Sequence, residues 1–157
     1  MKRIALVMLV LAGFCVNAHA QFFAGGSVGL QYRYEDFSMK LIPQVGYEFN
    51  DTWAVGCGAG IGYDGKAYAI VKPYVRYSFW NNEKIFLDLK AVSDLAIHDG
   101  SVTSFVGLCP SGRFAINDNL QLSADIALLG VDIYSKTVKP AFGLSAPGFE
   151  FAVLYRF

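Results

Sequence analysis

The segment from residue 98 to residue 101 holds the residues best suited to hydrolytic chemistry. It reads HDGS, so a histidine, an aspartate and a serine (His98, Asp99 and Ser101) lie within one short stretch. Hydrolysis by such a set needs a histidine base that a carboxylate orients and that lies about 3 Å from the hydroxyl nucleophile. Residues two or three apart in a polar loop seldom reach that geometry. We therefore expect a solvated turn here and no enzymatic activity.

Cysteine and histidine are too few for a metal site. Beyond residue 20 the only histidine is His98, and the only cysteines are Cys57 and Cys109. One imidazole and two distant thiols do not make a ligand set, so we expect no metal and no cofactor. The alternation described below puts Cys57 and Cys109 on opposite faces of their strands. We therefore expect no disulfide between them, even in an oxidising compartment.

The first twenty residues have the three parts of a secretory signal peptide. A cationic MKR precedes the apolar run IALVMLVLAGFCV, and AHA (18–20) supplies the small residues of a cleavage site. The run is shorter than the roughly 20 apolar residues that span a bilayer. Phe14 stands before Cys15, where a lipoprotein signal needs a small residue. We expect residues 1–20 to be a signal peptide, read by the Sec translocon and cut by signal peptidase after Ala20.

Residues 21–157 have the length of one domain and carry a weak negative charge. Loss of Lys2 and Arg3 leaves 11 basic residues against 13 acidic ones. A nucleic-acid partner would favour a basic surface, so we expect none. No run of 18 or more apolar residues occurs beyond residue 20. A membrane crossing by this sequence would therefore use strands and not helices.

Polar breaks divide residues 21–157 into eight segments in which apolar residues alternate with others. The shorter breaks are rich in Asn and Asp, as tight turns are, and fall at 49–52, 81–84 and 117–119. The longer breaks fall at 34–38, 63–67, 98–104 and 134–139. Tight turns that alternate with longer outer loops are typical of transmembrane barrels. We expect an all-β fold, an eight-stranded antiparallel up-and-down transmembrane β-barrel.

One parity of each segment is apolar and uncharged, whereas the other parity holds the charged residues. The seventh segment, for example, is expected to point Leu120, Leu122, Ala124, Ile126, Leu128 and Gly130 outward. About fifty apolar residues would not fit inside eight strands, and one Lys or Arg facing lipid costs roughly 2–4 kcal/mol at the midplane. We therefore place the apolar parity against lipid. The alternative fold is a soluble lipocalin-like barrel that binds an apolar ligand.

The charged parity is expected to plug the lumen. Side chains fill the interior of an eight-stranded barrel, and buried charges are costly unless they are paired. We expect a lumen charge network drawn from Lys72, Arg76, Asp88, Lys90, Arg113, Asp125 and Glu150. The segment 53–63 carries glycine at nearly all its inward positions. It is expected to leave a small polar gap beside it.

Aromatic residues gather at both ends of the segments and prolines recur along them. Two aromatic girdles are expected, one near the tight turns (Phe49, Trp53, Phe79, Phe114, Tyr155 and Phe157) and one near the longer loops (Tyr32, Tyr34, Tyr63 and Tyr134). Proline recurs in every second segment, at Pro43, Pro73, Pro110 and Pro147. Proline cannot donate to a strand ladder, so we expect each one at a bulge or a strand end.

The sequence resembles the small outer-membrane β-barrels of the OmpA transmembrane-domain and OmpX type. The resemblance covers residues 21–157 and rests on the signal peptide, the eight segments and the final FAVLYRF. In that family the terminal alternation is an assembly signal for the barrel-assembly machinery, a role that the match gives to Val153, Tyr155 and Phe157. The resemblance also implies a Gram-negative outer-membrane location, contact with membrane lipid and lipopolysaccharide, and a monomer.

The resemblance implies a structural role in envelope integrity or a surface-binding role. The outer loops are short beside those of the adhesive members, and no peptidoglycan-binding domain follows the barrel, so neither adhesion nor cell-wall tethering is expected. A small porin-like channel and a lipid A-modifying enzyme are the alternatives within the membrane. The sequence alone is compatible both with a structural role in the envelope and with a role in which the loops bind a partner.

Overall fold

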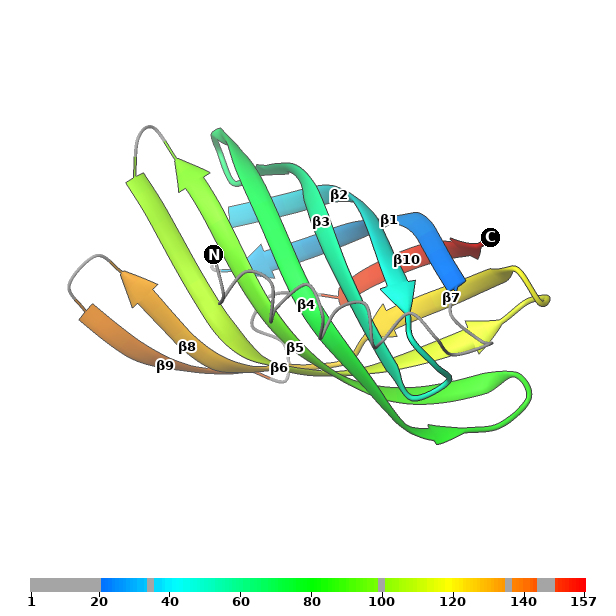
Figure 1. Ribbon diagram of the computed structural model, residues 1–157. Coiled ribbons are helices and arrows are strands. Elements are labelled where there is room, and N and C mark those ends of the chain that lie inside the picture. The colour runs from blue at the N-terminus through cyan, green and yellow to red at the C-terminus, as the bar shows by residue number, and fades with distance from the viewer. Residues whose placement is uncertain (1–20, 34–35, 99–100, 135–136, 144–148) are drawn as a thin grey trace, which may run out of the picture.

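The computed structural model describes residues 21–33, 36–98, 101–134, 137–143 and 149–157, and these residues form ten strands (Figure 1). The expected signal peptide, residues 1–20, lies outside the described residues. The strands are β1 (Gln21–Arg33), β2 (Asp36–Glu48), β3 (Trp53–Tyr63), β4 (Ala67–Asn81), β5 (Ile85–His98), β6 (Ser101–Ala115), β7 (Leu120–Asp125), β8 (Leu128–Tyr134), β9 (Thr137–Gly143) and β10 (Phe149–Arg156). Among the described residues, no helix is long and apolar enough to cross a membrane.

The strands close into an antiparallel up-and-down barrel. Neighbours along the chain pair from β1 to β7, and β10 pairs with β7 on one side and with β1 on the other. β8 runs along the remaining part of β6, and β9 pairs with β8, so the seventh expected segment is β7 with β8 and the eighth is β9 with β10. The predicted eight-stranded barrel is therefore confirmed. Figure 1 shows the β8–β9 hairpin at the end of the barrel away from the C-terminus.

In the seventh segment, the parity of the outward-facing residues changes between β7 and β8. The Ile126 amide donates to the Pro110 carbonyl at 2.9 Å, whereas Leu129 pairs with Leu108. Residues 127 and 128 therefore face the single residue Cys109, which is a β-bulge. An extra residue reverses the parity beyond it, and Leu129 is accordingly exposed. The outward position expected at Gly130 was therefore wrong, because the register shifts by one residue between it and Ile126. The side chain of Leu128 lies outside the described residues.

A second bulge adds an aromatic residue to the outer face of β4. Ser78 pairs with Asp88, but Trp80 pairs with Leu87, so Phe79 is the extra residue. Phe79 was expected to face outward and does so, and the bulge turns Trp80 outward beside it. The end of the barrel that holds the connections 49–52, 82–84 and 116–119 is called the tight-turn end. It carries more exposed aromatic surface than strict alternation predicts.

Ladders are interrupted at Pro43, Pro73 and Pro110, within strands that continue past them. Pairing between β2 and β3 skips residues 42–43, and pairing between β4 and β5 skips residues 72–73, both without a register shift. Pro110 lies opposite the bulge between β7 and β8. The prediction of a bulge is thus confirmed at Pro110, whereas Pro43 and Pro73 leave a gap in the ladder only. Pro147 lies outside the described residues.

The connections at the expected loop end are shorter than the sequence indicated. Strand pairing extends to Arg33–Asp36, Tyr63–Ala67, His98–Ser101 and Tyr134–Thr137. Two or three residues therefore separate the paired strands, and most of the polar breaks at 34–38, 98–104 and 134–139 are strand. The expected contrast between tight turns and longer loops was wrong, because at this end of the barrel polar residues continue the strands.

The lumen is packed with large side chains as well as charged ones. Tyr74, Ile42 and Tyr68 lie over the inward glycines of β3, where a Cβ atom at Gly56, Gly58 or Gly62 would approach within 2.4–2.5 Å of them. The glycine strand therefore makes room for bulky neighbours on β2 and β4. Two apolar clusters result, one of Phe23, Ala54, Tyr74, Val92, Cys109 and Leu154 and one of Ile42, Tyr68 and Ile70.

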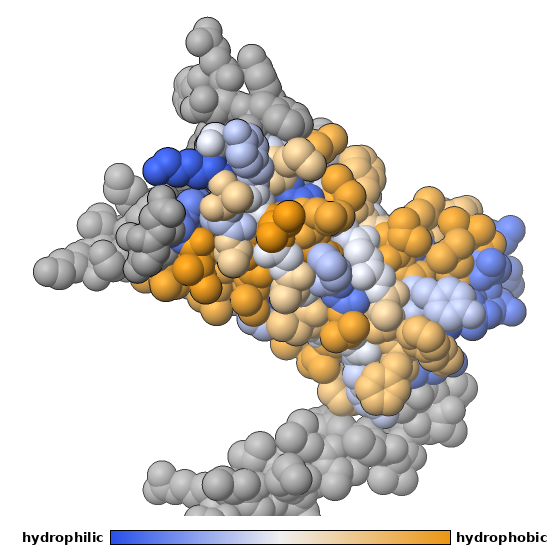
Figure 2. Space-filling model, turned by 90° about the horizontal axis from the view of Figure 1, so that it is seen from above, coloured by the Kyte–Doolittle hydropathy of each residue, from blue (hydrophilic) through white to orange (hydrophobic). Residues whose placement is uncertain are grey.

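Exposed side chains are sorted by type along the barrel wall. In the described strands the exposed large residues are apolar, apart from Gln21 and Asn81 at strand ends, and include Val28, Leu41, Ile61, Leu108 and Val153. The exposed charged residues that the structure describes all lie in connections, at Asp51, Asp64, Lys66, Glu83, Lys84 and Asp118. Figure 2 shows hydrophobic side chains over much of the visible wall and hydrophilic ones at the right-hand end.

The expected aromatic girdle at the tight-turn end is present. Trp53, Phe79, Phe114, Tyr155 and Phe157 are all exposed there. Aromatic contacts join Phe22, Tyr47 and Phe49 into one group and pair Trp53 with Tyr77. At the other end Tyr63 is exposed, whereas the side chains of Tyr32, Tyr34 and Tyr134 lie outside the described residues.

Candidate functional site: the charged lumen

Glu48 is the centre of a layer of charges near the tight-turn end, which we call the turn-end layer. Its carboxylate accepts a hydrogen bond from Arg76 across β3 and lies 2.8 Å from Nη2 of Arg156. Nη1 of Arg113 lies 3.5 Å from the same carboxylate. One buried carboxylate thus joins β2 to β4, β6 and β10, and each of these guanidinium groups gains a charge-assisted contact.

Arg113 makes the remaining contacts of the turn-end layer. Its guanidinium group donates to Asp88, which is 0% exposed, and to Oε1 of Gln121 at 2.7 Å. It also donates to the Ser78 hydroxyl at 3.0 Å, and that hydroxyl donates to Asp88 at 2.6 Å. The planar fork of Arg suits this role because it presents several donors in fixed directions. The layer therefore ties β4, β5, β6 and β7 together.

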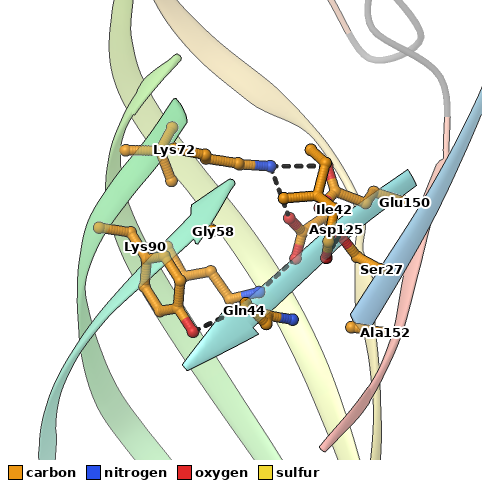
Figure 3. Close-up of a pocket in the computed structure, with 11 residues that line it drawn as sticks. Ser27, Ile42, Gln44, Gly58, Lys72, Lys90, Asp125, Glu150 and Ala152 are labelled. Carbon is orange, nitrogen blue, oxygen red and sulfur yellow. Dashed lines mark hydrogen bonds and ion pairs between the residues drawn. The ribbon is translucent and has the colours of Figure 1, made fainter. Parts of the chain in front are cut away.

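A second layer crosses the middle of the lumen, and we call it the middle layer (Figure 3). Nζ of Lys72 lies 2.6 Å from Glu150, and Nζ of Lys90 lies 2.6 Å from Asp125. Lys72 is also 4.0 Å from Asp125, so the four charges form one alternating chain. In the closed ring of strands β4 and β10 are four steps apart in either direction. The Lys72–Glu150 ion pair therefore joins opposite walls of the barrel.

A small polar gap lies within the middle layer, beside Gly58. Its volume is about 10 Å³, and its lining includes Ser27, Lys72, Tyr74 and Glu150. That volume is about the minimum that a buried water occupies. The Tyr74 hydroxyl donates to Oε1 of Gln44 at 2.9 Å on the same side of the lumen. A gap next to the glycine strand was expected, but it is too small for an ion with a hydration shell.

The loop end of the lumen contains a looser set of charges. Lys40 and Asp94 are 4.0 Å apart, and Nε2 of His98 lies 3.5 Å from Asp64. The His98 ring stacks on Tyr68 at a centroid distance of 4.1 Å. Because His98 and Asp64 are 33% and 45% exposed, their contact stabilises the barrel less than those of the two inner layers.

The hydrolytic set suggested by the sequence is rearranged in the structure. The carboxylate beside His98 belongs to Asp64 of the neighbouring hairpin. Asp99 and the side chain of Ser101 lie outside the described residues. The described contacts of His98 are the ion pair with Asp64 and the stacked ring of Tyr68.

The two cysteines lie on opposite sides of the barrel wall, as the alternation predicts. Cys57 is exposed on β3, Cys109 is buried on β6, and both are free. In the part of the chain that the structure describes, no group of three or more His, Cys, Asp or Glu side chains could hold a metal ion.

The structure places the seven residues of the expected network in the lumen and gives each an ion pair with another charged residue. The sequence analysis left Glu48 and Arg156 out of that set, although both have the inward parity. It also missed Gln121, Gln44 and Tyr74 as hydrogen-bonding partners. Parity identifies the inward residues, but their height in the tilted barrel decides which ones meet.

The residues of the expected assembly signal lie on the outer face of β10. Val153, Tyr155 and Phe157 are exposed, and the backbone of β10 pairs with β1 and β7 where the ring closes. Comparison with protein-family models and with curated proteins gave no match.

Proposed function

We propose that this protein is an integral outer-membrane β-barrel with a plugged lumen and a structural role in the cell envelope. The observation that carries the proposal is the sorting of exposed side chains, apolar along the strands and charged only in the connections among the described residues. A single Lys or Arg on a lipid-facing wall costs roughly 2–4 kcal/mol at the midplane. A barrel that met water would have no reason to keep charge off its strands. The soluble lipocalin-like alternative needs the apolar parity inside, and the structure has it outside.

The length of the strands supports membrane insertion. β3 has 11 residues and runs between the exposed aromatic residues Trp53 and Tyr63. At about 3.4 Å per residue and a tilt of about 40°, these residues span roughly 26 Å. This length matches the apolar band of about 25 Å in outer-membrane barrels. The aromatic residues at the ends of β3 then lie at the two membrane interfaces.

The packed lumen favours a structural role over transport. The middle layer joins opposite walls, and the gap within it is about 10 Å³. A porin-like channel needs a continuous aqueous path, which wider barrels leave open and eight strands do not. A surface-binding role is less well supported, because the connections at the loop end are short. Only two or three residues separate the paired strands there.

The route to the membrane follows from the same proposal. The Sec translocon and signal peptidase would process residues 1–20, and the barrel-assembly machinery would read Val153, Tyr155 and Phe157. Lipid and lipopolysaccharide would then surround the exposed apolar wall. The exposed position of these three side chains on the closing strand supports that reading.

Membrane fractionation tests the proposal directly. The full chain, expressed in a Gram-negative host, is expected in the outer-membrane fraction after alkaline carbonate extraction, with faster gel mobility before heating than after it. A carbonate-soluble monomer whose mobility does not change on heating would overturn the membrane assignment. Steady conductance in planar bilayers would overturn the plugged lumen and favour the channel. A deletion strain with normal detergent and antibiotic sensitivity would overturn the envelope role alone.

A further inference from the structure

The tight-turn end of the barrel opens into a cavity of about 470 Å³. Its lining comes from the β2–β3, β4–β5 and β6–β7 connections and from the ends of β1 and β10. Small-molecule sites usually have volumes of about 300–1,000 Å³. We propose that this cavity binds a small zwitterion, with the anionic group of the ligand at the floor and its ammonium group at the mouth.

The floor of the cavity is lined by Glu48, Gln121 and Arg156, which belong to the turn-end layer. That layer as a whole, including the guanidinium groups behind the floor, has an excess of positive charge. Arg76, Arg113 and Arg156 face only two carboxylates, Glu48 and Asp88. Four of these side chains are almost fully buried, and Arg156 is largely so. Burial makes an uncompensated charge costly, because water no longer solvates it. An anion at the floor would supply the missing negative charge.

Two donors at the floor have no hydrogen-bond partner. Gln121 is 1% exposed and lines the cavity, and its Nε2 makes no hydrogen bond although its Oε1 accepts one from Arg113. Nε of Arg156, which also lines the cavity, is unpaired as well. A buried donor without an acceptor costs about 1–3 kcal/mol. A carboxylate or phosphate group at the floor fits these donors better than an amine.

The mouth of the cavity has the opposite charge. Asp51, Glu83 and Asp118 come from three separate connections, and Lys84 is the one cation among the connection residues that line the cavity. Two negative charges are therefore in excess there. An anion alone would be repelled at the mouth, and a cation alone would leave the floor unsatisfied. A zwitterion meets both conditions.

An aromatic wall joins the floor to the mouth. Phe86 lines the cavity, and the guanidinium groups of Arg113 and Arg156 lie 4.6 and 5.9 Å from the centre of its ring. These cation–π contacts hold the donors of the floor beside the ring. The ring offers an apolar surface for the carbon atoms that separate the two charges of the ligand.

This chemistry belongs to free amino acids and peptides and also to the phosphoethanolamine headgroup of lipids. The protein, folded in non-ionic detergent micelles, is titrated with glycylglycine and observed through the backbone amides of residues 83–86 and 115–121. N-acetylglycylglycine keeps the anion only, and glycylglycinamide keeps the cation only. We expect glycylglycine to bind at least about tenfold more tightly than either, since each lost charged contact is worth that factor or more.

Other outcomes of this titration either overturn the proposal or identify the class of molecule that supplies the zwitterion. Equal binding of glycylglycinamide would reduce the cavity to an acidic mouth, and equal binding of N-acetylglycylglycine would reduce it to a cationic floor. Absence of shifts with all ligands, soluble headgroups included, would remove the site. Tighter binding of glycerophosphoethanolamine than of glycylglycine, with glycerophosphocholine weak, supports the proposal with a lipid headgroup as the source.

Variants separate the two halves of the site. Gln121→Glu places a negative charge at the floor and should weaken glycylglycine binding about tenfold. Asp118→Asn should weaken glycylglycine but strengthen N-acetylglycylglycine, because it lowers repulsion at the mouth. Asp64→Asn, at the opposite end of the barrel, is the matched control and should leave both affinities unchanged. If Gln121→Glu folds, as shown by heat-modifiable mobility, and binds normally, the assignment of the floor is wrong.

Discussion

Removal of Lys72 should destabilise the barrel more than removal of its partner Glu150. Their side chains are 12% and 18% exposed, and their charged atoms are 2.6 Å apart across the lumen. Breaking one side of a buried ion pair costs about 3–5 kcal/mol. Among the described residues, Glu150 has no second cation within 4 Å, whereas Lys72 keeps Asp125 at 4.0 Å. We expect Lys72→Met to lower the free energy of unfolding by about 3 kcal/mol and Glu150→Gln to lower it by about 1–2 kcal/mol, since solvent screens part of each charge.

The double variant distinguishes pairing from simple packing. Lys72→Met combined with Glu150→Gln removes both charges, so no buried charge is left alone. Its free energy of unfolding should exceed that of Lys72→Met by about 1 kcal/mol or more. Two independent packing defects would instead add their costs. The two substitutions are therefore expected to be strongly non-additive.

Equilibrium unfolding in urea, with the barrel folded in lipid vesicles, measures these free energies. Trp53 and Trp80 report unfolding, because both indoles are exposed near the tight-turn end and leave the membrane interface. Lys84→Met, in the β4–β5 connection, is the matched control and should change stability by less than about 0.5 kcal/mol. An additive double variant would refute the trans-lumen pairing. Equal costs for the two single substitutions would refute the role of Asp125 as the second partner of Lys72.

Three further outcomes test other parts of the structure. Leu108→Arg, at the centre of β6 and 47% exposed, should lower the stability of the inserted barrel by roughly 2–4 kcal/mol in the urea assay, whereas in a water-facing wall it would be neutral. Gly60→Ala should cost about 1–3 kcal/mol in the same assay, because its Cβ would lie 2.0 Å from a backbone oxygen, and Gly112→Ala, with open space around it, should cost little. In folded protein a membrane-permeant maleimide should label Cys57 but not Cys109, and mass spectrometry should find no disulfide between them.

The alternation of residue types was enough to predict the barrel, because a half-buried strand has a period of two. It does not mark the two bulges, for a definite reason. The residues around Leu128 and Leu129 are apolar on both parities, so hydrophobicity does not mark the register shift. The same holds at Phe79 and Trp80, which are adjacent and both aromatic. Backbone geometry determines where the bulges fall, and the composition of the segment does not indicate it.

Part of the lumen network was within reach of the sequence. In an eight-stranded up-and-down barrel the fourth and eighth segments face each other, so a cation of β4 and an anion of β10 at the same height must meet. Lys72 and Glu150 satisfy that rule. The role of Glu48 was beyond reach, because three guanidinium groups converge on it from strands whose relative heights depend on tilt and register. Side-chain parity contains no information on tilt.

The middle layer also sets how often the lumen can open. A continuous water path would require Lys72 to leave Glu150 and Lys90 to leave Asp125 at the same time. If each separation costs about 3 kcal/mol, the low end for a buried pair, the two together cost about 6 kcal/mol. Each 1.4 kcal/mol is a factor of ten in population, so fewer than about one molecule in ten thousand would be open. A barrel with that occupancy carries negligible current, so under the proposed function it would act through its wall and its ends.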